Sequence, residues 1–115
     1  MSRRSDKQLL LDMIEATERV LTYTKDTDEA KFLADPILID AVVRNIQVIG
    51  EAAFRISKEF KAATSEVEWS RITGMRHRLV HDYFEIEERL VWLVVSEKLP
   101  TFRTELEAVL GKAAD

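Results

Sequence analysis

The sequence predicts an all-α protein, a bundle of about four to five helices that forms one domain over residues 1–115. The chain has only three glycines and two prolines, so few positions interrupt a helix. Alanine, leucine, glutamate, lysine and arginine, which favour helices, are abundant. Apolar residues recur at three- and four-residue spacing through most of the chain. A length of 115 residues suits one modest core and is too short for two.

The first half of the chain carries three helix starts. Ser5 and Gln8 fit a capping box, and an amphipathic helix is expected from there to about residue 24. The polar run Thr27–Glu29 suggests a short second turn or helix. Asp35 followed by Pro36 predicts a third start, because proline suits the first helical position and aspartate can cap it. This third helix is expected to continue to about residue 56.

The next segment is expected to be a loop followed by another helix. Residues 59–65 read as the loop, and Ser65 with Glu68 offers a second capping box. Apolar residues at helical spacing then continue to about residue 80. The segment His81–Phe84 is expected at or just beyond the end of this helix.

A fourth long helix is expected over Glu87–Lys98. Its six-residue apolar run fits a strand equally well by periodicity, but the charged flanks favour a helix. A helix that is apolar on all sides must be covered by the core or by a partner subunit. Pro100 is expected to break or restart the chain before a last amphipathic helix near residues 102–110.

Composition excludes several classes of protein. The longest apolar run has six residues, at 90–95, far fewer than the roughly 20 that cross a bilayer. Cysteine is absent, which excludes disulfides, thiol nucleophiles and Cys-ligated zinc. The net charge of −4 means that nucleic-acid binding would need a local basic patch. Asp12 and Glu15 interrupt any signal-peptide-like apolar region, so we expect a cytoplasmic protein with no membrane partner.

Such a basic patch lies in the second half of the chain. From Arg71 to His81 there are three arginines, two histidines and no acid. Metal-free RNA cleavage needs a base for the ribose 2′-hydroxyl, an acid for the leaving oxygen and a cation for the phosphate. Histidine titrates near working pH, and arginine offers a permanent charge in a fixed fork. The segment is therefore a candidate RNA-cleaving site.

The spacing of the patch limits its geometry. On a helix His77 and His81 share a face, because they are four residues apart. Arg76 and His81 are five residues apart, roughly 140° around an ideal helix. They converge only if the helix ends or unwinds near His81, or if a second copy supplies the partner. A twofold dimer would bring two such segments into one cleft.

Arg76, His81 and Tyr83 together resemble the RX4HXY signature of the HEPN superfamily. More narrowly, the chain resembles the HepT-like toxins of minimal-nucleotidyltransferase (MNT) toxin–antitoxin modules. The likeness covers roughly residues 12–106. Further matching segments are Arg44–Ala53, Trp69–Arg76, Val91–Trp92 and Leu99–Pro100.

The resemblance implies a HEPN-like helical homodimer that cleaves RNA without metal or cofactor where the two motifs meet. It assigns Arg76 and His81 as the catalytic pair. It also implies an MNT-type nucleotidyltransferase antitoxin, which in some members transfers AMP from ATP to the motif tyrosine, here Tyr83. A bulky charged adduct there would block RNA and repel its phosphates. Residues expected to support the site or contact RNA are His77 (commonly Asn in the family), Arg78, Arg44, Asn45 and Glu51.

Each candidate also has a purely structural interpretation. Arg76 could cap a helix or pair with a carboxylate such as Glu51, and His81 could be an ordinary histidine at a helix C-terminus. Tyr83 could lie at the edge of the core. Solvated or interhelical positions are the structural alternatives for Arg78, Arg44, Asn45 and Glu51.

Two other functions are compatible with the sequence. The chain could be a non-catalytic helical module that binds the nucleotidyltransferase or a nucleotide, with Tyr83 only as an acceptor. It could also be a metal-binding bundle, because His77 and His81 have the spacing of two ligands on one helix face. No third ligand is indicated, and Arg78 occupies the place of the usual glutamate, so we expect no metal.

Overall fold

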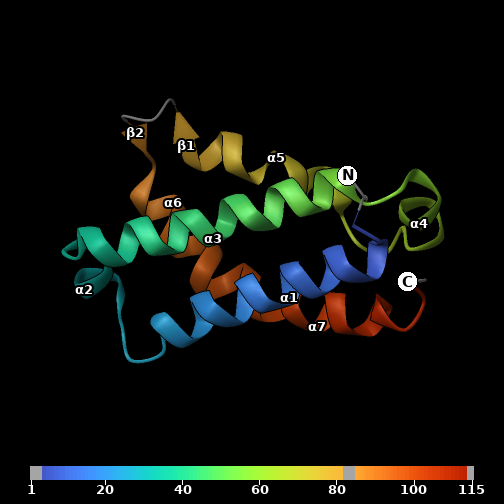
Figure 1. The fold of residues 1–115 in the computed structure, drawn as a ribbon. Helices are drawn as coiled ribbons and strands as arrows, with labels where there is room; N and C mark the ends of the chain where they lie inside the picture. The colour runs from blue at the N-terminus through green and yellow to red at the C-terminus, as the bar shows by residue number, and fades with distance from the viewer. Residues whose placement is uncertain (1–3, 82–84, 114–115) are drawn as a thin grey trace.

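The computed structural model describes residues 4–81 and 85–113, with only the backbone described at Arg76, Val80, His81 and Glu85. It is a helical bundle, which confirms the all-α prediction (Figure 1). Two strands of two residues each are added to the helices. The elements are α1 (Asp6–Tyr23), α2 (Glu29–Leu33), α3 (Pro36–Arg55), α4 (Lys58–Ala63), α5 (Trp69–Leu79), β1 (Val80–His81), β2 (Glu85–Ile86), α6 (Glu88–Leu93), the π-helix η1 (Val94–Lys98) and α7 (Leu99–Leu110).

The three helix starts predicted in the first half are confirmed. The Ser5 hydroxyl accepts a hydrogen bond from the backbone N–H of Gln8 at 3.1 Å, and the Gln8 side chain accepts one from the Ser5 N–H at 2.8 Å. The carboxylates of Asp28 and Asp35 accept backbone N–H bonds in the first turns of α2 and α3. Pro36 occupies the start of α3 as expected. These signals are local, which is why the sequence alone reveals them.

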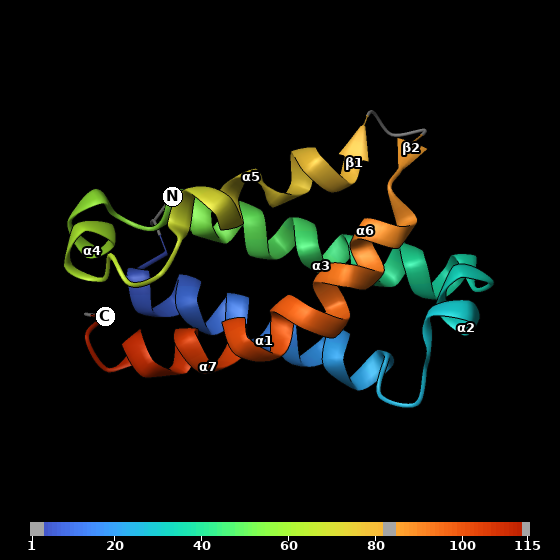
Figure 2. The same ribbon diagram turned by 180° about the vertical axis from the view of Figure 1, so that it is seen from behind.

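The long helices pack around one core. Helix α3 packs against α1 on one side and α5 on the other, and α7 packs against α1. Figure 1 shows α5, α3 and α1 in that order, and from behind α6 crosses α3 while α7 runs alongside α1 (Figure 2). No helix in the described part of the chain is long and apolar enough to cross a membrane. Fully buried side chains include Leu10, Met13, Val20, Phe32, Val42, Ile46, Ile49, Val91, Leu99 and Leu106.

The loop expected at residues 59–65 is wrong, because α4 forms there. The Ser57 hydroxyl accepts a bond from the N–H of Phe60 at 3.1 Å and so caps α4. Asp6, 51 residues away, in turn accepts hydrogen bonds from the Ser57 N–H at 2.9 Å and the Ser57 hydroxyl at 2.6 Å. The ring of Phe60 lies 6.2 Å from that of Trp69. The Ser57 cap is a local signal that the sequence analysis missed, whereas the contact with Asp6 joins residues that are distant in the sequence.

The start of α5 also differs from the prediction. The first helical bond runs from the N–H of Ile72 to the carbonyl of Glu68, and α5 begins at Trp69. Ser65 therefore lies three residues before the capping position, and the predicted Ser65–Glu68 capping box is wrong. The Trp69 indole N–H instead donates to the carbonyl and hydroxyl of Thr64, at 3.3 and 3.2 Å.

Pro100 does not interrupt the chain as expected. Helix α6, the π-helix η1 and α7 follow one another without a loop. Proline has no N–H, and its ring clashes with the carbonyl four residues earlier, here that of Ser96. The wider π turn relieves this conflict: Leu99, next to the proline, donates its N–H to the carbonyl of Val94, five residues back. One continuous helical segment thus replaces two separate helices.

Candidate functional site

A short hairpin carries the motif segment away from α5. Helix α5 ends at Leu79, and β1 and β2 pair antiparallel with Val80 opposite Ile86 and His81 opposite Glu85. The N–H of Glu87 donates to the carbonyl of Leu79 at 2.7 Å and closes the base of the hairpin. The backbone of His81 is therefore extended and fixed between α5 and α6.

The end of α5 changes the relation between the motif residues. Arg76 belongs to the helix and His81 to the strand that follows. The roughly 140° separation expected on a continuous helix therefore does not apply, and one of the two conditions for convergence, a helix end near His81, is met. The shared helix face predicted for His77 and His81 is wrong for the same reason. Tyr83 lies outside the described residues.

The side chains of His77 and Arg78, the two residues that follow Arg76, are both exposed. One guanidinium nitrogen of Arg78 donates to the carbonyl of Arg71 at 2.9 Å. A methyl group added at Gly74 would lie 3.3 Å from Nη1 of Arg78, so this guanidinium folds back over Gly74. Arg78 is thus held along its own helix, whereas no hydrogen bond or ion pair to another described residue is observed for the His77 side chain.

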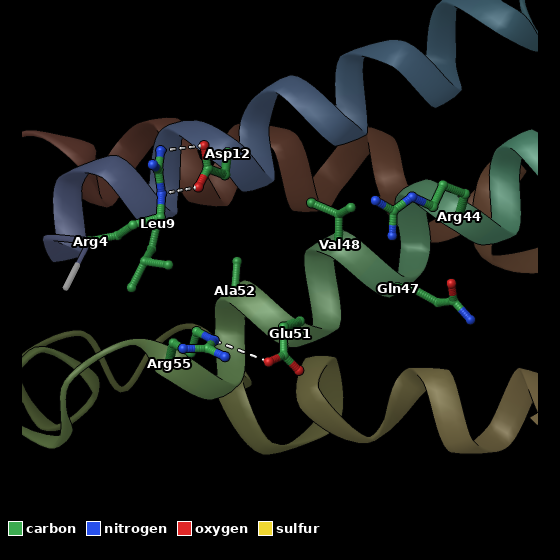
Figure 3. A pocket seen from close by; sticks show the side chains of 9 residues that line it. All are labelled: Arg4, Leu9, Asp12, Arg44, Gln47, Val48, Glu51, Ala52 and Arg55. Atoms are coloured by element: carbon green, nitrogen blue, oxygen red, sulfur yellow. Dashed lines mark hydrogen bonds and ion pairs between the residues drawn. The ribbon is translucent and has the colours of Figure 1, made fainter. Parts of the chain in front are cut away.

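A groove of about 460 Å³ runs between α1 and α3 and contains Arg44 and Glu51 (Figure 3). Glu51 accepts a bond from Arg55 at 3.0 Å. At the other wall Arg4 binds Asp12 through two bonds of 2.7 and 2.9 Å. Arg44 has no ion pair with another described residue. The groove is lined by Arg4, Leu9, Asp12, Arg44, Gln47, Val48, Glu51, Ala52 and Arg55.

Asn45 is separated from this groove. It is 7% exposed and points into the packed side of α3, where its Nδ2 donates to the carbonyl of Ala41 at 2.9 Å. The set predicted from the sequence is therefore divided, with Arg44 and Glu51 in the groove and Asn45 outside it. The sequence analysis did not single out Arg55 or Gln47, although their helical spacing from Glu51 places them on the same face. It also missed the backbone pairing of His81 with Glu85, because two-residue strands leave no periodic signal.

A second groove, of about 660 Å³, lies between α5, α6, η1 and α7. Its lining is largely apolar, and Leu90 and Leu93 on its α6 side remain 43% and 41% exposed. Arg71 and Arg78 lie at its α5 side. Within the described residues no group of three His, Asp or Glu side chains is placed to hold a metal ion.

Comparison with known proteins identifies relatives of this chain. The family model described as ribonuclease HepT-like matches residues 13–109. A Methanocaldococcus jannaschii protein provisionally named an RNase is 36% identical over 95% of this chain and all of its own length. A Thermococcus cleftensis protein provisionally named ribonuclease HepT is 34% identical over 91% of this chain and 96% of its own. No solved structure matches.

Proposed function

The chain belongs to the ribonuclease HepT-like family, and we propose that it cleaves RNA without a metal ion, as a homodimer, through Arg76 and His81. The family and its RNase-named relatives support an RNA-cleaving enzyme. The observation that carries the proposed site is the end of α5 at Leu79, which frees His81 from the helix that holds Arg76.

The reaction needs two proton transfers and one charge neutralisation. A base removes the proton of the ribose 2′-hydroxyl, the 2′-oxygen bonds to phosphorus, and the bond from phosphorus to the 5′-oxygen breaks as an acid protonates that oxygen. The products are a 2′,3′-cyclic phosphate and a 5′-hydroxyl. His81 serves in the proton steps, and Arg76 binds the phosphate and stabilises its developing charge. Each chain has one motif histidine, so two copies supply both base and acid.

Regulation by a partner is the second part of the proposal. The resemblance to HepT-like toxins supports a toxin neutralised by an MNT-type nucleotidyltransferase antitoxin. Transfer of AMP from ATP to the hydroxyl of Tyr83 releases pyrophosphate and leaves a charged adduct two residues from His81. Such an adduct would exclude RNA by bulk and by charge repulsion.

The direct test is cleavage of labelled RNA in excess EDTA by the full chain. We expect cyclic-phosphate products from the wild type and a loss of rate of about 10² to 10⁴ in both His81→Ala and Arg76→Ala. Arg103→Ala on α7, where the arginine pairs with Glu107, removes a surface cation elsewhere and should leave the rate unchanged. Cleavage by His81→Ala at the wild-type rate would exclude this mechanism.

A non-catalytic interaction module is favoured by one observation, the apolar groove with exposed Leu90 and Leu93. In that case the nucleotidyltransferase and ATP would modify Tyr83, and RNA cleavage would be absent both before and after. Intact mass and cleavage measured on the same sample separate the two functions.

A further inference from the structure

The outer face of α3 is exposed toward both ends of the helix, and Gln47 and Val48 at its middle are partly buried. Helix α3 packs against α1 and α5 at its two sides, and Figure 3 looks directly onto the face between them. Ile37 near its start is 83% exposed and Phe54 near its end is 67% exposed. We define the α3 outer face as Ile37, Asp40, Arg44, Gln47, Val48, Glu51, Phe54 and Arg55, which share one side of the helix by their spacing.

The charges of the α3 outer face follow a self-complementary order. From the N-terminus they are acidic at Asp40, basic at Arg44, acidic at Glu51 and basic at Arg55. The midpoint of this order lies between residues 47 and 48. Reversal of the helix about that point places Asp40 opposite Arg55 and Arg44 opposite Glu51, so every charge meets its opposite. This is the pattern that an isologous twofold interface requires.

We propose that the α3 outer face is the surface on which two copies of this chain pair, with the two α3 helices antiparallel. Arg44 of one copy binds Glu51 of the second, and Asp40 binds Arg55 of the second. The inference deepens the proposed dimer and rests on the proposed function for the role it gives to pairing.

The contacts within one chain leave charges free for this pairing. Arg55 binds Glu51 at 3.0 Å, and neither Asp40 nor Arg44 forms an ion pair with another described residue. In the dimer the Arg55–Glu51 pair would lie between Asp40 and Arg44 of the second copy, giving a row of four alternating charges. The twofold axis generates this row twice. A network of this kind fixes register and partner choice more than affinity.

The same pairing brings the two motif segments together. In the antiparallel pairing the twofold axis lies in the interface and is perpendicular to α3. Rotation about this axis leaves each edge of the interface on its own side, so the α5 helices of the two copies lie along the same edge. A parallel pairing would instead place α5 beside α1. Figure 1 shows β1 beside the middle part of α3 rather than beyond its ends. The antiparallel dimer therefore places both His81 backbones on one edge, near the axis, where a shared cleft can form.

Charge reversal tests the register. By symmetry Arg44→Glu replaces two attractive contacts with two repulsive ones, so we expect the dimer dissociation constant to rise at least about tenfold. The double variant R44E/E51R restores opposite charges across the interface and should recover most of the dimer. Its cost is two like-charge pairs within each chain, one between position 44 and Asp40 and one between position 51 and Arg55, and each is small for exposed helix neighbours. Arg103→Glu on α7 is the matched control.

Sedimentation equilibrium over a wide protein range, with circular dichroism to verify folding, gives the result. A monomeric wild type, an Arg44→Glu dimer as tight as wild type, or a double variant no better than the single one would overturn the interface. RNA cleavage by the same samples separates the two proposals. The expected dimerisation pattern without any cleavage would reject the nuclease and keep the interface. Cleavage by samples whose dimerisation does not respond to the charge reversals would keep the nuclease and reject the interface.

Discussion

Removal of the Phe32 ring should weaken the support of the hairpin that holds His81. Phe32 on α2 is 0% exposed, and its ring lies 5.2 Å from that of Trp92 on α6. Helix α2 packs on both α3 and α6, and α6 begins two residues after β2. The variant Phe32→Ala therefore leaves a cavity between the elements that hold the hairpin from its C-terminal side.

The size of the effect follows from burial and ring contact. A buried Phe→Ala change typically costs about 3–5 kcal/mol, including the cavity that it leaves. A domain of this length has a free energy of unfolding of roughly 6–17 kcal/mol, so the variant should fold but with a large fraction of its stability lost. At about 4 °C per kcal/mol for a chain of this length, the melting temperature should fall by roughly 12–20 °C.

Urea unfolding followed by circular dichroism measures the change, with Tyr23→Ala as the control because Tyr23 is 46% exposed. We expect the control to lose less than about 1 kcal/mol of its free energy of unfolding. Phe32→Leu, which keeps most of the side-chain volume, should lower the free energy of unfolding by less than about 1.5 kcal/mol. If Phe32→Ala were no worse than Tyr23→Ala, the α2–α6 contact would not stabilise the fold as argued.

Two further substitutions test local contacts by thermal or urea unfolding. Gly74→Ala should stabilise the protein by about 0.5–1 kcal/mol, because alanine favours a helix more than glycine does. The nearest atom to the added methyl group belongs to the flexible end of Arg78, at 3.3 Å. A loss of stability would show that this guanidinium cannot move. Asp6→Ala removes both bonds from Ser57 and should cost about 1.5–3 kcal/mol. Equal stability of Asp6→Ala and a variant at exposed Asp26 would contradict a link between α1 and α4.

The parts of the fold predicted correctly depend on neighbouring residues. Ser5 with Gln8, Asp28, and Asp35 with Pro36 each determine a helix start within one turn, and such signals are visible in the sequence. Helix α4 has a local cap at Ser57 that the sequence analysis missed, and its link to Asp6, 51 residues away, is one that no local pattern reveals. The π-helix at residues 94–98 was not predicted, because helix propensity does not reveal how the backbone before Pro100 adjusts to the proline.

The candidate site likewise has a part that the sequence predicts and a part that it does not. Arg76, His81 and Tyr83 are recognisable in the sequence because the motif is contiguous. The hairpin that separates His81 from α5 has strands of two residues, too short for an alternating pattern to show. The position of Arg44 and Glu51 on an uncovered face, with Asn45 buried behind it, became clear only once α3 was placed between α1 and α5.

The cyclic-phosphate assay in EDTA tests the central claim most directly. Wild-type protein and His81→Ala are incubated with the same RNA at a protein concentration at which the wild type is dimeric. The account predicts 2′,3′-cyclic phosphate ends from the wild type and a rate lower by about 10² to 10⁴ in the variant. An intact RNA with wild-type protein, or equal rates for the two proteins, would contradict it.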